Sequence, residues 1–127
     1  MPSHVLDYQW SSGNNQTSAQ VSKSADAEIN AEVAVAGAST DLQVVLPIVI
    51  ASLVSLYMVC DRALTVQTND GSSPDDTISL AAGVPLVWHS TCGLDNPLGS
   101  DVTDLYLTLA AGADATFTIK TLQDVTP

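Results

Sequence analysis

The densest apolar stretch of the chain, residues 42–68, limits what the chain can fold into. Residues 44–59 carry no charged side chain, so a membrane-spanning helix is the first alternative to weigh. Such a helix needs about 20 apolar residues, and this run is shorter. It also contains Pro47 among several Val and Ile residues, which suit strands better than helices. We therefore expect strands here and no membrane span.

Alternation of the side chains divides this stretch into three consecutive strands separated by a break at residues 51–53 and by a turn near residue 62. The residues expected to face inward are Leu42, Val44, Leu46, Ile48, Ile50, Val54, Leu56, Met58, Cys60, Leu64 and Val66. Because the residues between them in the first two strands are also largely apolar, we expect those two strands to be central in a sheet or covered on both faces.

The rest of the chain reads as short strands separated by turns rich in Gly, Asn, Asp and Pro. Residues 4–10 form a first strand at an edge, and residues 17–24 an exposed one. Residues 27–35 favour a strand, although their Ala and Glu content leaves a helix open. Further strands are expected near residues 77–80, 84–89, 105–109 and 115–122, with residues 91–100 irregular. This pattern predicts an all-β fold: an antiparallel β-sandwich, jelly-roll-like, as a single domain over residues 1–127. Residues 1–24 are expected to include a polar, partly extended N-terminal arm that orders on a neighbour.

The predicted core follows from the inward positions of these strands. It consists of Ile29, Val33, Val44, Leu46, Ile48, Leu56, Met58, Leu64, Val66, Ile78, Leu86, Trp88, Leu105, Leu107, Phe117 and Ile119. Cys60 and Cys92 show no metal or redox spacing, and no secretion signal is visible in residues 1–20, so we expect free thiols. A bridge between the two cysteines remains open.

The charge is strongly unbalanced, with 14 acidic residues against three basic ones and a net charge of −11. A surface this acidic repels phosphate backbones and anionic lipid, so we expect neither nucleic acid nor membrane as a partner. The acidity serves either solubility or attraction to a basic partner surface. Six acids in predicted loops are expected to face solvent and are the candidate partner contacts: Asp70, Asp75, Asp76, Asp95, Asp101 and Asp104.

No pattern of residues predicts catalysis, and we expect no catalytic, cofactor-binding or metal-binding residues. His4 and His89 are the only histidines, and His89 and Ser90 point to opposite faces of a strand, which is unsuitable for a nucleophile and its base. We expect His89 on the outer face of a strand or at a contact. Two Asp/Asn-rich loops leave calcium binding open, although such residues are ordinary in turns. Trp88 is expected in the core, whereas Trp10 is the better candidate for an exposed ring and, in a glycan-binding module, for sugar stacking.

Two segments carry a resemblance to a known group of proteins. DRALTVQTNDGSSPDDTISLAAGVPLVWHS (residues 61–90) and SDVTDLYLTLAAGADATFTIKTLQDVTP (residues 100–127) resemble small structural proteins encoded in tailed-phage genomes, in their PDDTI, AGVPLxW and DVTxLY strands. The resemblance implies a virion component assembled in the host cytoplasm, namely a head decoration (cement) protein that binds the major capsid protein as a homo-oligomer, with a trimer favoured. A tail or neck component, or a glycan- or calcium-binding β-sandwich module, are the alternatives.

Overall fold

The structure, a computed structural model, describes residues 2–125, in which nearly all of the regular secondary structure is strand. The strands are β1 (Ser3–Ser12), β2 (Asn15–Ser24), β3 (Ala27–Val35), β4 (Leu42–Ile48), β5 (Leu53–Cys60), β6 (Leu64–Thr68), β7 (Thr77–Leu80), β8 (Leu86–His89), β9 (Val102–Thr108) and β10 (Ala115–Gln123). A single 3-10 turn, Ile50–Ser52, fills the break between β4 and β5. The strand prediction for residues 27–35 is confirmed over the helix alternative. Among residues 2–125, no helix is long and apolar enough to cross a membrane.

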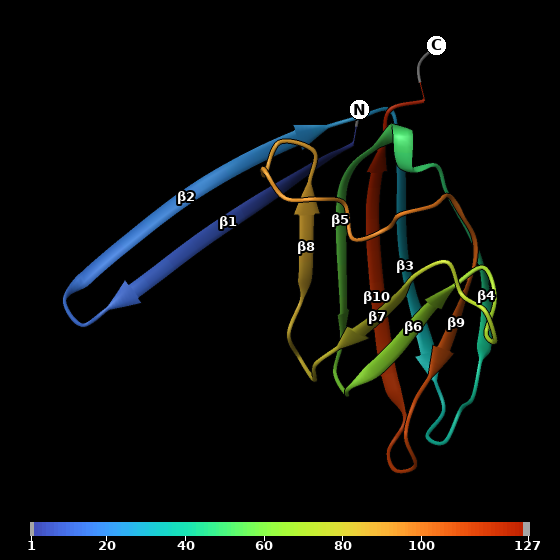
Figure 1. Cartoon of the computed structure of the whole chain (residues 1–127). Coiled ribbons are helices and arrows are strands. Elements are labelled where there is room, and N and C mark those ends of the chain that lie inside the picture. The colour runs from blue at the N-terminus through green and yellow to red at the C-terminus, as the bar shows by residue number, and fades with distance from the viewer. Residues whose placement is uncertain (1, 126–127) are drawn as a thin grey trace.

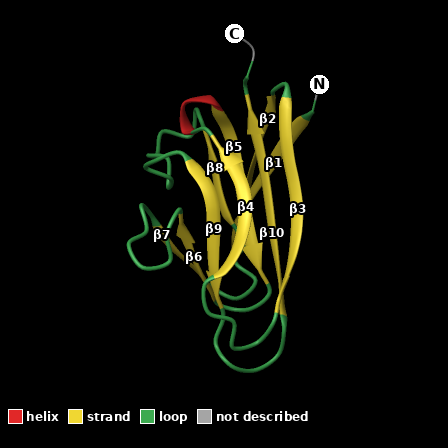
Figure 2. Cartoon of the chain, turned by 90° about the vertical axis from the view of Figure 1, so that its right-hand side faces the viewer, coloured by secondary structure: helices red, strands yellow, loops and turns green. Residues whose placement is uncertain are grey.

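Two four-stranded antiparallel sheets form a sandwich, with strand orders β3-β10-β5-β8 and β4-β9-β6-β7 (Figures 1 and 2). The pairings are nested along the chain: β6 pairs with β7, β5 with β8, β4 with β9, and β3 with β10. A long antiparallel ribbon wrapped in this way is a jelly roll, in which two further pairings, β5 with β10 and β6 with β9, close the sheets. The predicted antiparallel sandwich is therefore confirmed.

The core lies between the two sheets and contains most of the predicted residues. Phe117, Val66 and Leu107 are completely buried, and Leu56, Met58 and Ile119 nearly so. Four predicted members, Ile29, Val33, Val44 and Leu86, are only half-buried against this core. They belong to β3, β4 and β8, which are edge strands of their sheets, so the partner strand that would cover one side is missing.

The prediction that the first two central strands are both internal or covered is wrong for β4. Strand β5 lies between β10 and β8, but β4 is an edge strand of the other sheet. Its outward side is open to solvent, with Val45 76% exposed, and Val49, which directly follows the strand, is 46% exposed. Pro47 fits this position because a proline has no N–H for the ladder, and the β4–β9 register shifts between Val45 and Ile48. Ile50, predicted to continue the strand, begins the 3-10 turn instead.

Strands β1 and β2 form a separate two-stranded hairpin, here called the arm (residues 3–24), which leaves the sandwich at an angle (Figure 1). The pairing is continuous from Ser3 opposite Ser24 to Ser12 opposite Asn15. At its root, the amide of Ala25 donates to the carbonyl of Pro2 at 3.2 Å. The expected N-terminal arm is thus a regular hairpin, and residue 1 lies outside the described residues.

Candidate functional site

The loop acids are organised around Asn69, which directly follows β6 and has a left-handed backbone with φ of 68°. Its side-chain amide donates to the Asp75 carboxylate at 2.6 Å and to the Asp101 carbonyl at 2.7 Å. The amide oxygen accepts from the Thr103 backbone N–H at 2.8 Å. The Asn69 N–H itself donates to the carbonyl of Asp104 at 2.9 Å. One asparagine therefore ties the β6–β7 loop to the start of β9.

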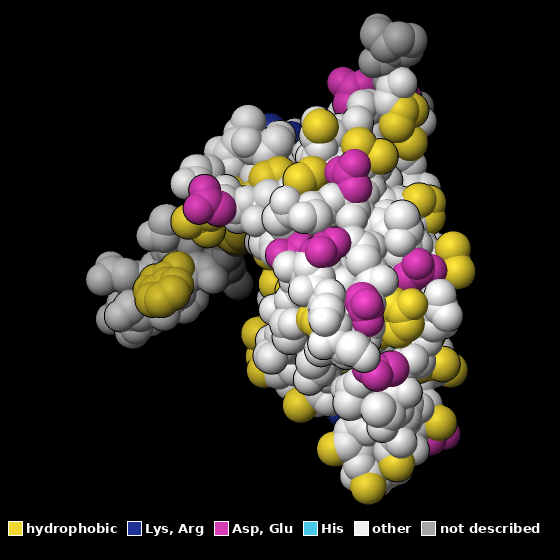
Figure 3. All heavy atoms as spheres, turned by 45° about the vertical axis from the view of Figure 1, so that its right-hand side comes forward, with side chains coloured by type: hydrophobic (Ala, Val, Ile, Leu, Met, Phe, Trp, Pro, Cys, Tyr) yellow, Lys and Arg dark blue, Asp and Glu magenta, His cyan; other side chains and the backbone are white. Residues whose placement is uncertain are grey.

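Five of the six candidate acids belong to the segments joined by Asn69, and we call Asp70, Asp75, Asp76, Asp101 and Asp104 the acid cluster. Asp70, Asp75 and Asp101 are exposed, whereas Asp76 and Asp104 are half-buried. Asp95 is also exposed, but it lies in the loop after β8, outside these segments. Acidic side chains recur over the face of the sandwich seen in Figure 3.

Several of these carboxylates also hold backbone groups. Asp76 accepts from the Gly99 N–H at 2.9 Å, Asp101 from the Ile50 N–H at 2.9 Å, and Asp70 from the Ser72 N–H at 2.8 Å. Among residues 2–125, no three His, Cys, Asp or Glu side chains are arranged to hold a metal ion. In the acid cluster the carboxylates accept hydrogen bonds from amide and backbone N–H groups. In a calcium site, by contrast, oxygen atoms would surround the cation. The carboxylates of the acid cluster serve as hydrogen-bond acceptors that fix the loops.

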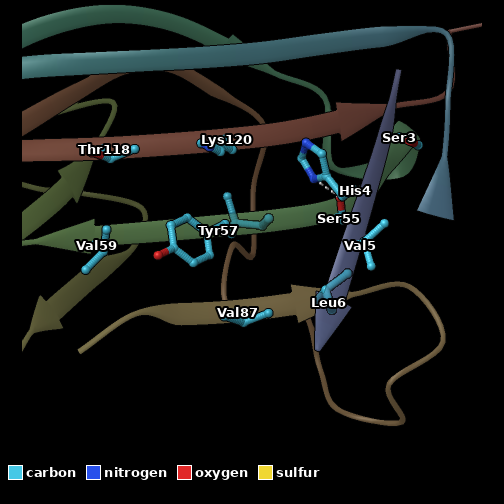
Figure 4. Close-up of a pocket in the computed structure, with 11 residues that line it drawn as sticks. Ser3, His4, Val5, Leu6, Ser55, Tyr57, Val59, Val87, Thr118 and Lys120 are labelled. Carbon is cyan, nitrogen blue, oxygen red and sulfur yellow. Dashed lines mark hydrogen bonds between the residues drawn. The ribbon is translucent and has the colours of Figure 1, made fainter. Parts of the chain in front are cut away.

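A second polar cluster, which the sequence did not reveal, lies at the root of the arm. The hydroxyl of Ser55 in β5 is 2.6 Å from Nδ1 of His4 in β1 (Figure 4). Nε2 of the same histidine is 3.3 Å from a carboxylate oxygen of Glu28 in β3. The Nε2 contact does not have hydrogen-bond geometry. No local motif announces the group, because its members lie on three different strands.

These three residue types resemble a hydrolytic triad, but their setting differs from one. Ser55 is only 1% exposed, which leaves its oxygen little access to a substrate. It also lies within β5, paired on one side with His89 and on the other with Leu122, so the backbone amides around it belong to a sheet rather than to an oxyanion hole. The contact joins the arm to the outer face of the β3-β10-β5-β8 sheet. We interpret it as the attachment point of the arm.

The other residues with possible chemistry occupy structural positions. His89, paired with Ser55, is buried at 6% exposure, with Nδ1 3.2 Å from the Thr91 hydroxyl. The expectation of free thiols is confirmed, with Cys60 buried and Cys92 half-buried. Trp88 is buried, as predicted, and its indole N–H donates to the Leu94 carbonyl at 3.0 Å. Trp10 is 76% exposed, which confirms it as the exposed ring.

The arm has one apolar and one polar face. In the β1–β2 register Leu6 lies opposite Val21, Tyr8 opposite Ala19, and Trp10 opposite Thr17, and directly opposed residues share a face. Leu6, Tyr8, Trp10, Ala19 and Val21 make this face largely apolar, with His4 and Lys23 on it at the root. The other face carries Ser, Gln and Asp side chains, with Val5 as its exception. The expectation of a polar arm is correct for one face only.

A groove of about 450 Å³ lies between the root of the arm and the outer face of the sheet. We call it the arm groove, and its sheet wall is formed by Tyr57 and Val59 of β5, Val87 of β8, and Thr118 and Lys120 of β10 (Figure 4). Ser3, His4, Val5 and Leu6 of the arm line the other side. Figure 3 shows the corresponding notch between the arm and the sandwich. Tyr57, Val59 and Val87 make this part of the outer sheet face largely apolar, with Thr118 and Lys120 as its polar members.

No protein family, no curated protein and no solved structure matches this chain.

Proposed function

We propose that the chain is a structural protein of a tailed-phage virion, assembled in the host cytoplasm, that binds the outside of the capsid and stabilises it without catalysing a reaction. The arm carries this proposal. A two-stranded hairpin is at best marginally stable in water unless it is packed against other structure. Here its tip stands away from the sandwich with Trp10 76% and Tyr8 43% exposed. An apolar hairpin of this kind is suited to assembly, in which a neighbouring surface covers it.

The acid cluster is the surface that we propose for approach to the shell. The chain has three basic residues for 14 acidic ones, so most carboxylates have no basic partner within it. Exposed ion pairs are worth only about 0–1 kcal/mol each and are screened by salt, so they guide encounter more than they hold a complex. A basic patch on the major capsid protein is the expected partner, and many copies on one shell make such weak contacts effective together.

The experiment is to add the purified protein to empty shells that lack it and to follow association and dissociation as salt rises. We expect association to slow with salt and dissociation to change less. The double variant Asp75→Asn, Asp76→Asn should associate more slowly. Asparagine retains an oxygen that accepts the bonds from Asn69 and Gly99, so the loops keep their acceptors.

The matched control is Asp61→Asn, Asp114→Asn, which changes the net charge equally at exposed positions outside the acid cluster, directly after β5 and directly before β10. Asparagine there keeps the oxygens that accept from the Thr116 and Gly37 N–H groups. This control should associate almost as fast as the wild type. Association that ignores both salt and the Asp75/Asp76 change would exclude the acid cluster as the docking surface. If the protein binds no shell of the phage that encodes it, the decoration role itself is refuted.

Glycan binding is the second candidate, because Tyr8 and Trp10 are exposed rings on the same face of the arm. Two neighbouring aromatic rings are a small stacking platform. Screening the protein against glycans, with Trp10→Ser as the control, tests this directly. Retention of glycan binding in that variant would remove the arm from consideration as the sugar site.

A further inference from the structure

We propose that the arm groove of one copy receives the tip of the arm of a second copy of this chain, so that Trp10 and Tyr8 cover Tyr57, Val59 and Val87 of the neighbour. This deepens the proposed function by naming the surfaces through which copies contact one another. From the resemblance we expect three copies in the closed assembly, and sedimentation velocity measures that number.

The apolar face of the arm and the apolar sheet wall of the groove form one continuous surface. At the root, the apolar face of the arm is already partly covered, with Leu6 and Val21 half-buried and His4 bonded to Ser55 on the outer sheet face. Toward the tip the same face continues through Tyr8 to Trp10, where no residue of its own chain covers it among those described. The sheet wall of the groove continues along β5, away from the root of the arm, with Tyr57 and Val59. The arm therefore covers one end of an apolar sheet face and leaves the other end open.

The distribution of charge also favours the arm groove as the contact between two copies. Each copy carries −11, so two copies repel over most of their surfaces. The arm contains one acid, Asp7, and one base, Lys23, and the groove lining contains Lys120 and no acid. Two of the three basic residues of the chain are therefore on the arm and in its groove. This is the part of the surface where a second, equally acidic copy can approach, whereas a strongly basic partner is drawn to the acid cluster.

The arm is long enough to reach a second copy, and the side chains near its tip suit the groove. Each strand of the arm has ten residues, which span about 33 Å, so the tip extends well beyond its own sandwich. Trp10 over Lys120 is a favourable cation–π arrangement, and Tyr57 offers an aromatic neighbour. Insertion of the tip also supplies the additional layer that a two-stranded hairpin needs for stability.

The test is the oligomeric state of the purified chain alone, by sedimentation velocity from low to high micromolar concentration. The wild type should self-associate. Trp10→Ser, which removes the indole ring near the tip, and Val87→Asp, which places an acid in the groove wall, should each weaken self-association about thirty-fold or more, as expected for a central aromatic anchor. Matched controls are Val45→Ser, an equally exposed residue on β4, and Val84→Asp, an exposed valine outside the groove. Both should associate like the wild type.

Mixing the two defective variants gives a sharper result. Trp10→Ser retains an intact groove and Val87→Asp retains an intact arm, so an equimolar mixture should form a complex of one copy of each. Failure of the mixture to associate, a monomeric wild type at the highest concentration, or wild-type association of Trp10→Ser would each overturn the proposal. If the wild type is monomeric alone and Trp10→Ser loses only shell or glycan binding, the arm belongs to that partner instead.

The dependence on salt distinguishes self-association through the arm from docking on a shell, which belongs to the proposed function. Salt screens the repulsion between two copies of charge −11 while the apolar contact remains, so self-association should strengthen with salt. Docking on a shell through the acid cluster should slow under the same conditions. A chain that forms arm-dependent oligomers but binds no shell would refute the decoration role and leave the arm contact standing. The reverse result would refute only the arm contact.

Discussion

Replacing Asn69 tests how much of the acid cluster depends on one side chain. Its side-chain amide takes part in four hydrogen bonds of 2.6 to 3.2 Å, one each with Asp75 and Asp101 and two with the N–H and hydroxyl of Thr103. Each such bond contributes a net of about 0.5–1.5 kcal/mol, and the half-buried site lowers the upper limit through competition with water. We therefore expect Asn69→Gly, which deletes the side chain but accepts the backbone geometry, to lose about 2–3 kcal/mol of unfolding free energy.

Asn69→Ala adds a second cost. The φ of 68° lies in the left-handed region, which asparagine and glycine tolerate and alanine does not. Alanine should therefore be less stable than glycine at this position by about 1 kcal/mol, which is the reverse of the usual order of these residues in strands and helices. The pair of variants separates the hydrogen bonds from the backbone conformation.

The assay is urea unfolding followed by circular dichroism or tryptophan fluorescence, with Asn30→Ala on the exposed face of β3 as the control. The control should lie within about 0.5 kcal/mol of the wild type. If Asn69→Gly is also within that range, the side chain does not hold the loops together. If glycine and alanine are equally destabilising, the left-handed backbone contributes nothing that can be measured.

Three further changes have expected effects on the free energy of unfolding. Leu56→Ala should lose about 2–5 kcal/mol because the side chain is 1% exposed in the core, and a loss below about 0.5 kcal/mol in urea unfolding would contradict its position. Arg62→Met should lose about 1–2 kcal/mol, since the half-buried guanidinium donates to three carbonyls of the β9–β10 turn; an unchanged denaturation midpoint would show that water replaces those bonds. Gly37→Ala should lower the melting temperature, because a Cβ there would lie 2.0 Å from the Gly112 carbonyl oxygen. A melting temperature equal to that of the wild type would mean that the two turns separate easily.

Alternation predicted the strands well because, in a two-layer sandwich, burial repeats every second residue. This is why the pattern in residues 54–60 and 64–68 placed Leu56, Met58 and Val66 correctly. It could not predict which strands are edges, since strand order depends on pairing between distant segments. Apolar residues on both sides of β4 therefore indicated a covered strand, although Val45 faces solvent. Pro47 was the local signal that favoured an edge.

The candidate site was predictable in part for the same reason. Acids in turns were expected at the surface from their chemistry alone, but their connection through Asn69 depends on β9 returning beside β6. The contact of His4 with Ser55 joins residues 51 positions apart and had no sequence signal. The apolar face of the arm did have one, because Leu6, Tyr8 and Trp10 alternate with polar residues. The register that places Val21 and Ala19 beside them came only from the structure.

The nested pairing has a consequence for how each copy is made on the ribosome. Among residues 2–125, β10 is the last strand, yet it lies inside its sheet, between β3 and β5. Until residues 115–123 have left the exit tunnel, β3 and β5 cannot be joined and the inner face of one layer stays open. Synthesis proceeds at roughly 5–20 residues per second, so a nascent chain carries unpaired apolar strands for several seconds. The arm, whose two strands are adjacent in sequence, can pair early in that interval, before any sandwich exists to support it.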